Sequence, residues 1–358
     1  MIVFFLFAHA QEIPKNKLQE DAIEWEFEHY TRPFSDKAPF VSAQVCSMCH
    51  KEIFSQWKES RHAQSWSNDI FMEGYIMEPD PICVYCHAPH QEQVQEIKKN
   101  EDWVRAMHPV HGSLMDRPKR LPEPSADEGI TCASCHLREG KVIAAQDKPL
   151  AAHPISVNPR LSQSVFCKDC HDFPVIERHN GQTIISETAM QTTYQEWLAW
   201  EAQGNTQQCQ GCHMPDGRHD WHGANNREIL HQSVSISLHR ERESVVFTLE
   251  SVGVGHHMPT GDLFRHMRIE VFKAGEWQEV AYIGRKFASQ WEDERPYKRL
   301  VHDSSLRPGI PQSYHLSEKK RLPWRLVYYY TSQKDIFRAL LPRSVVTEVL
   351  AEGMLPPI

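Results

Sequence analysis

Residues Cys209–Gly223 read CQGCHMPDGRHDWHG, in which two cysteines three positions apart are followed at once by a histidine. The same C-x-x-C-H form occurs four more times, and together the five copies contain all ten cysteines of the chain. Zinc sites, redox dithiols and covalently attached haem all use C-x-x-C. The residue that follows the second cysteine therefore has to separate these alternatives.

A histidine at that position in every copy is the attachment signature of c-type haem, in which the thiols bond the porphyrin and the histidine binds iron. Structural zinc sites do not require this histidine, and five pairs cannot be divided evenly into four-cysteine sites. Cysteines three residues apart rarely form a good structural disulfide, and no cysteine remains outside the motifs. The sequence thus predicts five haem c groups. Their attachment residues are Cys46, Cys49, Cys83, Cys86, Cys132, Cys135, Cys167, Cys170, Cys209 and Cys212, and their proximal iron ligands are His50, His87, His136, His171 and His213.

The composition agrees with a protein whose core is partly porphyrin. Hydrophobic residues make up 40% of the 358 residues, slightly below the usual globular range, and large apolar haem groups would supply the missing core. The formal charge of −8 argues against a nucleic-acid or anionic-membrane surface, which would need a basic patch. It favours redox partners with basic docking surfaces.

The N-terminal residues indicate export. Residues 1–10, MIVFFLFAHA, combine an apolar run with a small-x-small ending, the form of a short signal peptide without its basic start. A buried strand is the alternative. Haem is attached outside the cytoplasmic membrane, which independently places the protein in the periplasm or at the cell surface. No later stretch approaches the ~18 apolar residues of a membrane span.

Further histidines are available as distal iron ligands, and geometry restricts their use. Residues 43–66 read as one helix, which would place His50 and His62 about 18 Å apart along its axis. His62 therefore cannot bind the iron that His50 binds and must serve another haem. His90 lies three residues after His87 and could also serve only a neighbouring haem. The predicted distal ligands are His62, His111, His153, His219 and His256, with His90, His108, His179, His222 and His257 as alternatives.

Three stretches resemble multihaem cytochromes c of the cytochrome c554 type. They are the run Trp57–Ala63 with its S-x-H-A ending, the final C-x-x-C-H-M-P, and Gly253–Gly261, which reads GVGHHMPTG. The resemblance implies that His62 and His219 are distal ligands and that Gly253–Gly261 opens a C-terminal β domain. His256 occupies the histidine position of that segment, although its neighbour His257 leaves the choice open.

The order of patterns predicts a mainly helical and irregular multihaem cytochrome domain followed by a β-sandwich. A lead-in over 11–40 precedes the pentahaem domain over 41–225, in which 192–203 is the clearest later helix. Alternation of apolar and polar residues then predicts strands in a sandwich over 226–332. The tail, 333–358, is expected to be helical over 335–350. The sandwich is either a structural appendage or, if His256 binds iron, a clamp on the haem domain.

Three functions fit these features. The leading hypothesis is an electron carrier whose haems each bind two imidazoles, leaving no position for a substrate. The second is an enzyme that acts on a small nitrogen or sulfur compound at one haem with an open sixth position. Five-haem nitrite reductases use a proximal lysine at the catalytic haem, and all five motifs here end in histidine. The third is a subunit of an extracellular cytochrome filament or surface complex.

Overall fold

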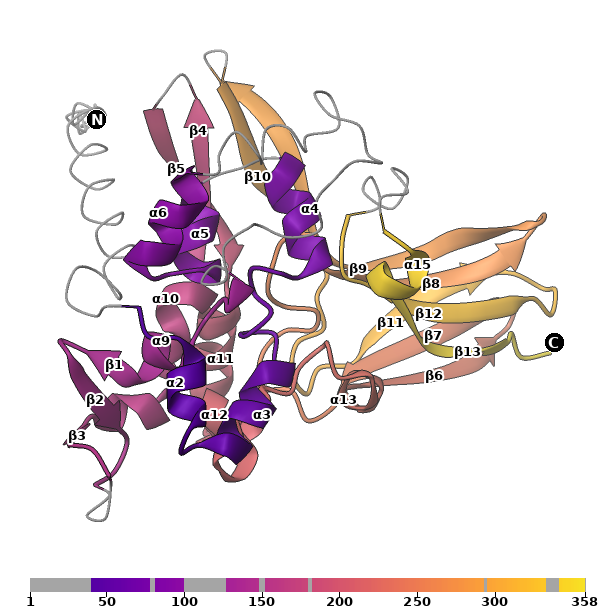
Figure 1. Ribbon diagram of the computed structural model, residues 1–358. Helices are drawn as coiled ribbons and strands as arrows, with labels where there is room; N and C mark the ends of the chain where they lie inside the picture. The colour runs from indigo at the N-terminus through magenta and orange to yellow at the C-terminus, as the bar shows by residue number, and fades with distance from the viewer. Residues whose placement is uncertain are drawn as a thin grey trace, which may run out of the picture.

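The computed structural model describes residues 40–77, 81–99, 127–147, 152–179, 182–292, 295–332 and 341–357. The predicted signal peptide, nearly all of the lead-in, and the candidate ligands His108 and His111 lie outside these residues. The described chain forms a helical, cysteine-rich region followed by antiparallel β-sheets, as the sequence predicted (Figure 1). No helix within the described ranges has the length and apolarity that a membrane crossing requires.

Short helices dominate the first region, and the C-x-x-C-H motifs coincide with helix ends. Cysteines three apart lie on one face of a helical turn, and the histidine that follows is the last helical residue in four of the five motifs. The helices are α2 Ala43–Ser47, α3 Lys51–Glu59, α4 Asp69–Met77, α5 Pro81–His87, α6 Gln91–Lys99, α9 Cys132–His136, α10 Lys168–His171, α11 Thr193–Glu201, α12 Cys209–His213 and α13 Arg227–Gln232, with 3-10 turns η1 Pro159–Ser162, η2 Ser164–Cys167 and η3 Pro215–Gly217.

The single helix expected over 43–66 is wrong. The chain breaks between α2 and α3 at the first motif, and α3 ends at Glu59, because Ser60 adopts extended backbone angles. The hydroxyl of Ser60 accepts the N–H of Ala63 at 3.2 Å, which stabilises a turn in place of a further helical turn. His62 therefore lies in a turn beyond α3, where its orientation is set by tertiary contacts.

Two small sheets within the first region were not anticipated from the sequence. Strands β1 Leu137–Arg138, β2 Lys141–Ala144 and β3 Ile155–Val157 form one of them, with β2 and β3 parallel. Strands β4 Phe173–His179 and β5 Gln182–Gln191 form an antiparallel hairpin. The β4–β5 hairpin lies beside β10 of the second region in Figure 1, and the two regions are joined there by a hydrogen bond from the Ser186 hydroxyl to the Lys298 carbonyl.

The second region is a two-sheet sandwich. One sheet has the order β10-β9-β8-β12-β13 and the other β11-β7-β6, and every pairing in both is antiparallel. The strands are β6 Val234–Glu241, β7 Ser244–Ser251, β8 His266–Lys273, β9 Glu276–Glu292, β10 Arg295–Asp303, β11 Gln312–Ser317, β12 Pro323–Tyr329 and β13 Thr347–Met354.

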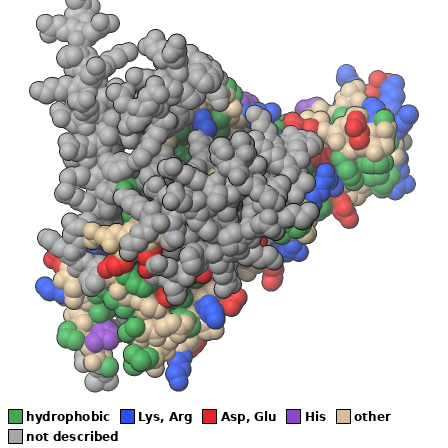
Figure 2. Space-filling view, turned by 45° about the horizontal axis from the view of Figure 1, so that its top comes forward, with side chains coloured by type: hydrophobic (Ala, Val, Ile, Leu, Met, Phe, Trp, Pro, Cys, Tyr) green, Lys and Arg blue, Asp and Glu red, His purple; other side chains and the backbone are tan. Residues whose placement is uncertain are grey.

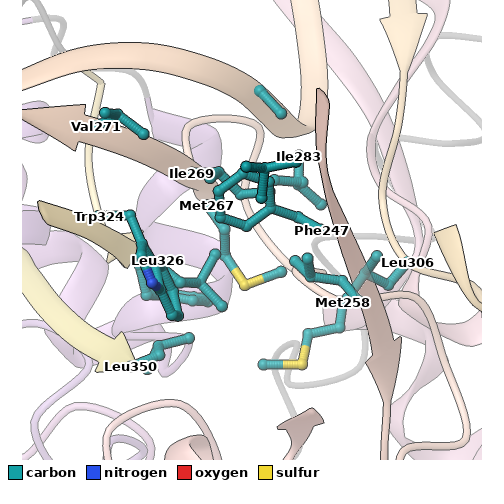
Figure 3. Packing of buried hydrophobic residues seen from close by; sticks show 14 of the residues in the cluster. Phe247, Met258, Met267, Ile269, Val271, Ile283, Leu306, Trp324, Leu326 and Leu350 are labelled. Carbon is teal, nitrogen blue, oxygen red and sulfur yellow. The ribbon is translucent and has the colours of Figure 1, made fainter. Parts of the chain in front are cut away.

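Alternating side chains from both sheets fill the sandwich core. Figure 3 shows Phe247 of β7 facing Met267 of β8 and Leu326 of β12, all three fully buried. Burial of each such side chain contributes roughly 1.5–3 kcal/mol relative to exposure. The sandwich thus has a core that does not depend on porphyrin.

The helical tail expected over 335–350 is wrong where the structure describes it. Only Arg343–Val346 is helical, as the single turn α15, and Thr347–Met354 is the strand β13, which pairs with β12. Leu350 and Leu355 are buried in the sandwich core. Pairing and burial at the sheet edge outweigh the helical propensity of the local sequence, because an uncovered β12 would leave its backbone groups without partners.

Candidate haem sites

None of the ten cysteines forms a disulfide, and three of the motif histidines are held by a backbone carbonyl. The Nδ1 atom of His87 lies 2.8 Å from the Ser65 carbonyl oxygen, and that of His136 lies 2.9 Å from the Ile143 carbonyl oxygen. His213 makes the same contact with the carbonyl of His222. A carbonyl only accepts, so Nδ1 carries the proton and donates it. The Nε2 atom is therefore the unprotonated nitrogen that can bind a metal.

Distal histidines lie opposite four of the five proximal ones. Each pair joins residues from distant parts of the chain with ring centroids just over 6 Å apart. The pairs are His50 with His153 at 6.2 Å, His171 with His62 at 6.4 Å, His136 with His219 at 6.1 Å, and His213 with His256 at 6.1 Å.

This spacing fits one iron between two imidazoles. A metal–nitrogen bond of about 2 Å and a distance of roughly 1.2 Å from nitrogen to ring centre place two trans rings about 6.4 Å apart. Rings packed directly on each other would lie closer, as Phe71 and His87 do at 3.7 Å. The four pairs leave room for an iron, and their donors are those that haem iron accepts.

Two of the candidate distal histidines are oriented by the same kind of backbone contact as His87, His136 and His213. Nδ1 of His219 donates to the Gly217 carbonyl at 2.8 Å, and Nδ1 of His256 donates to the His257 carbonyl at 2.8 Å. Both nitrogens that would face the iron are then Nε2 atoms. In the pairs His136–His219 and His213–His256, both rings thus have the tautomer that leaves Nε2 free to bind a metal.

Burial favours the neutral form of five of the paired rings. Desolvation lowers the pKa of His62 to about 3, with a smaller contribution from nearby histidines, and lowers that of His171 to about 4. Burial also lowers the pKa of His136, His219 and His256. A neutral imidazole has the free lone pair that a metal requires.

His62 is fixed by docking of its turn onto the residues that precede the third motif. Its carbonyl accepts the N–H of Ile130 at 3.0 Å, while the Ile130 carbonyl accepts the indole N–H of Trp57 at 2.8 Å. Gly129 has φ of 55°, and a Cβ there would lie 2.7 Å from the His62 carbonyl oxygen. Only glycine allows this approach, so the position of His62 depends on a contact more than sixty residues away in sequence.

His256 is carried by a loop that two buried charged side chains attach to the first region. Glu196 of α11 accepts the backbone N–H of His257 at 3.2 Å and the hydroxyl of Thr260 at 2.6 Å. Arg285 of β9 donates to the carbonyls of Gly261 at 2.7 Å and Met190 at 2.8 Å. The 253–261 loop is thus held from both regions. Sequence patterns gave no sign of these two residues.

The proximal ligand His87 has no imidazole among its ring contacts within the described chain. Its ring stacks on Phe71 with an interplanar angle of 10°. Its predicted distal partner, His111, and the alternative His108 lie outside the described residues, so this assignment stays a prediction.

The remaining alternatives have other contacts. His90 is fully buried, and its Nε2 lies 3.0 Å from the Ser134 hydroxyl and 3.2 Å from that of Thr131. The His257 ring lies 3.7 Å from the Glu196 carboxylate. His222 contributes its carbonyl to His213, and His179 ends β4. Because the His256 ring lies opposite that of His213 while the His257 ring lies near Glu196, the geometry favours His256 over His257 as the distal ligand.

Contacts between cysteines show which motifs lie side by side. The thiol of Cys46 lies close to that of Cys132, and the same holds for Cys86 with Cys170 and for Cys167 with Cys209. The motifs are numbered 1 to 5 along the chain, beginning at Cys46, Cys83, Cys132, Cys167 and Cys209. Motif 1 therefore lies beside motif 3, and motif 4 lies beside motifs 2 and 5. The guanidinium of Arg138, two residues after motif 3, lies 5.6 Å from the ring centroid of Phe166, the residue before motif 4, which places motif 3 near motif 4. All five motifs therefore form one connected group.

A family of multihaem cytochromes matches the same part of the chain. The family, described as outer membrane cytochrome MtrC/MtrF-like, domains II/IV, matches residues 40–224, slightly more than half of the chain. The chain belongs to this family. It is a multihaem c-type cytochrome, the broader class to which the cytochrome c554 resemblance also pointed.

Among solved structures, the chain is similar to a penta-heme cytochrome c552 from Thermochromatium tepidum. The identity is 21%, the match covers 89% of this chain and 99% of the other, and the TM-score is 0.63. At this identity the likeness concerns the fold, and it extends over both regions. A superoxide reductase in the oxidised state matches 35% of this chain and 88% of its own at 15% identity, with a TM-score of 0.20. A search of the curated proteins gave no match.

Replacement of His256 with alanine is expected to convert one low-spin haem to high spin, because the iron opposite His213 loses its second imidazole. The same change should increase hydrogen exchange in residues 253–261. Electron paramagnetic resonance (EPR) of the oxidised protein and hydrogen-exchange mass spectrometry would measure the two effects.

His257→Ala is the matched control, since the backbone carbonyl that orients His256 remains. It should leave all haem signals unchanged. High-spin signal in the His257 variant and none in the His256 variant would reverse the assignment.

Proposed function

We propose that the protein is an exported pentahaem electron carrier whose haems bind two histidines each. The observation that carries this proposal is the set of four imidazole pairs, each with the spacing of two ligands on one iron. The proposed cofactor-binding residues are the ten motif cysteines. The proposed iron ligands are the five motif histidines with His62, His111, His153, His219 and His256.

In this proposal the haems supply one-electron transfer, and the protein residues supply ligation, orientation and exclusion of water. The rings of His87, His136 and His256 would bind iron through Nε2, because backbone carbonyls accept the hydrogen bond from Nδ1 of each. Two ligands per iron leave no position for a substrate. No side chain is assigned a catalytic role.

The contacts between motifs favour a conduit over five isolated sites. Because motif 4 neighbours motifs 2 and 5 and lies near motif 3, which touches motif 1, every attachment site has at least one close neighbour. Electron transfer between cofactors requires such closeness. We therefore assign a pentahaem domain over 41–225. The sandwich that follows it acts as a clamp on this domain, because its 253–261 loop carries His256.

Location and partners are inferred from the family and from charge. The family description names outer membrane cytochromes, and covalent haem attachment takes place outside the cytoplasm, so we place the protein in the periplasm or at the cell surface.

The formal charge of −8 would become more negative with haem propionates, which favours redox partners with basic surfaces. Figure 2 shows acidic and basic side chains interspersed over the described part of the sandwich, so this face is not a single-sign surface.

The second candidate is an enzyme acting on a small nitrogen or sulfur compound at the haem of His87. Its proximal ring stacks on Phe71, and no recorded ring contact of His87 in the described chain is with another histidine. This site is the one where an open sixth position would have to be sought.

Five haems should be attached to each chain. Intact mass of the purified protein is expected to equal the processed polypeptide plus five haem groups, and haem staining on a denaturing gel should follow the polypeptide. Zinc in place of iron, or fewer than five haems in fully matured protein, would contradict the proposal.

The oxidised protein should give only low-spin ferric EPR signals, because every iron has two imidazoles. Addition of hydroxylamine or nitrite should leave these signals and the optical spectrum unchanged. A stable high-spin haem that binds either compound would favour the enzyme.

A further inference from the structure

The segment Gly217–His222 contacts ligands of three proposed haem sites. The Gly217 carbonyl orients His219, which pairs with His136 of motif 3. The His222 carbonyl orients His213 of motif 5. Between them, the ring of Trp221 lies against His62, the partner of His171 in motif 4.

We propose that Trp221 is a positioning residue that sets the ring orientations of two distal ligands together, His62 and His219. This inference rests on the proposed ligation by those two histidines. It adds a side chain that neither the motifs nor the family resemblance assigns, and it couples the haem of motif 4 to that of motif 3 through one indole.

The ring geometry is the first support. The Trp221 ring centroid lies 4.6 Å from that of His62 with an interplanar angle of 81°, and 5.2 Å from that of His219 with an angle of 90°. Both contacts are edge-to-face, the favourable arrangement for aromatic rings. An indole held between two imidazoles in this way restricts rotation of both.

The backbone at Trp221 is the second support. Its φ is 42°, in the left-handed region that bulky residues rarely adopt, so the conformation persists only because the surroundings enforce it. Gln56 of α3 accepts the N–H of His219 at 2.9 Å, and the His222 carbonyl accepts a hydrogen bond from Nδ1 of His213. The segment is thus fixed on both sides of the indole. Strain of this kind clusters at functional sites.

The packing of Trp221 offers a matched control. Trp221 packs on the buried cluster of Ala43, Trp57 and Ala63. Phe54 of α3 packs on the same cluster, and its ring contacts Trp57. Substitution of Phe54 or of Trp221 therefore disturbs the same core, but of these two side chains only Trp221 lies against the imidazoles of His62 and His219.

The test is EPR of the oxidised holoprotein, because the g values of a ferric haem with two imidazoles depend on the angle between the ring planes. The His62 and His171 planes differ by 63° and those of His136 and His219 by 32°. Trp221→Leu is expected to shift or broaden two low-spin signals at once and leave the others in place. Trp221→Phe, which keeps an aromatic edge, should restore most of the wild-type spectrum, and Phe54→Leu should not change it.

Each outcome bears on the inference. An unchanged spectrum for Trp221→Leu, or a shift of only one signal, would overturn it, as would equal changes in Phe54→Leu. The variants His62→Ala and His219→Ala distinguish a failure of the proposed role of Trp221 from a failure of the proposed iron ligation. If each of these converts one haem to high spin while Trp221→Leu has no effect, ligation stands and the role of Trp221 is rejected.

Discussion

In our proposal, coordination of one iron by two imidazoles is the constraint on which the rest of this structure depends. A proximal histidine next to its cysteines cannot supply the second nitrogen, so each distal ligand must come from another part of the chain. His153 lies opposite His50, and His219 lies opposite His136, across more than eighty residues. The short helices and turns of the first region can be understood as the connections that bring these rings together.

The sandwich illustrates the same constraint at a larger scale. Its core is complete without haem, but the 253–261 loop faces the first region and places His256 opposite His213. Glu196 and Arg285 bind that loop from the two regions with charged groups that are almost fully buried. Burial of charge is costly unless it is satisfied, so these contacts have a function beyond simple packing. In our account they fix the distance between two rings that share an iron.

The sequence predicted what local patterns encode and missed what tertiary contacts decide. The helix α11 and the strands β6 to β8 follow from the apolar pattern and its alternation. The end of α3 at Glu59 did not, because the turn at Ser60 depends on its own hydroxyl and on the contact of His62 with Ile130. The strand β13 was taken for a helix, because its pairing with β12 is invisible in local propensity. Trp221, Glu196 and Arg285 belong to no motif, and only their neighbours reveal their importance.

An experimental structure of the holoprotein with all haems bound tests this account most directly, through the identity of the sixth ligand of each iron. The account predicts Nε2 of His153, His219, His62 and His256 on the irons whose proximal ligands are His50, His136, His171 and His213, at metal–nitrogen distances of about 2 Å. Water, another side chain or an empty position at any of these four irons would contradict it.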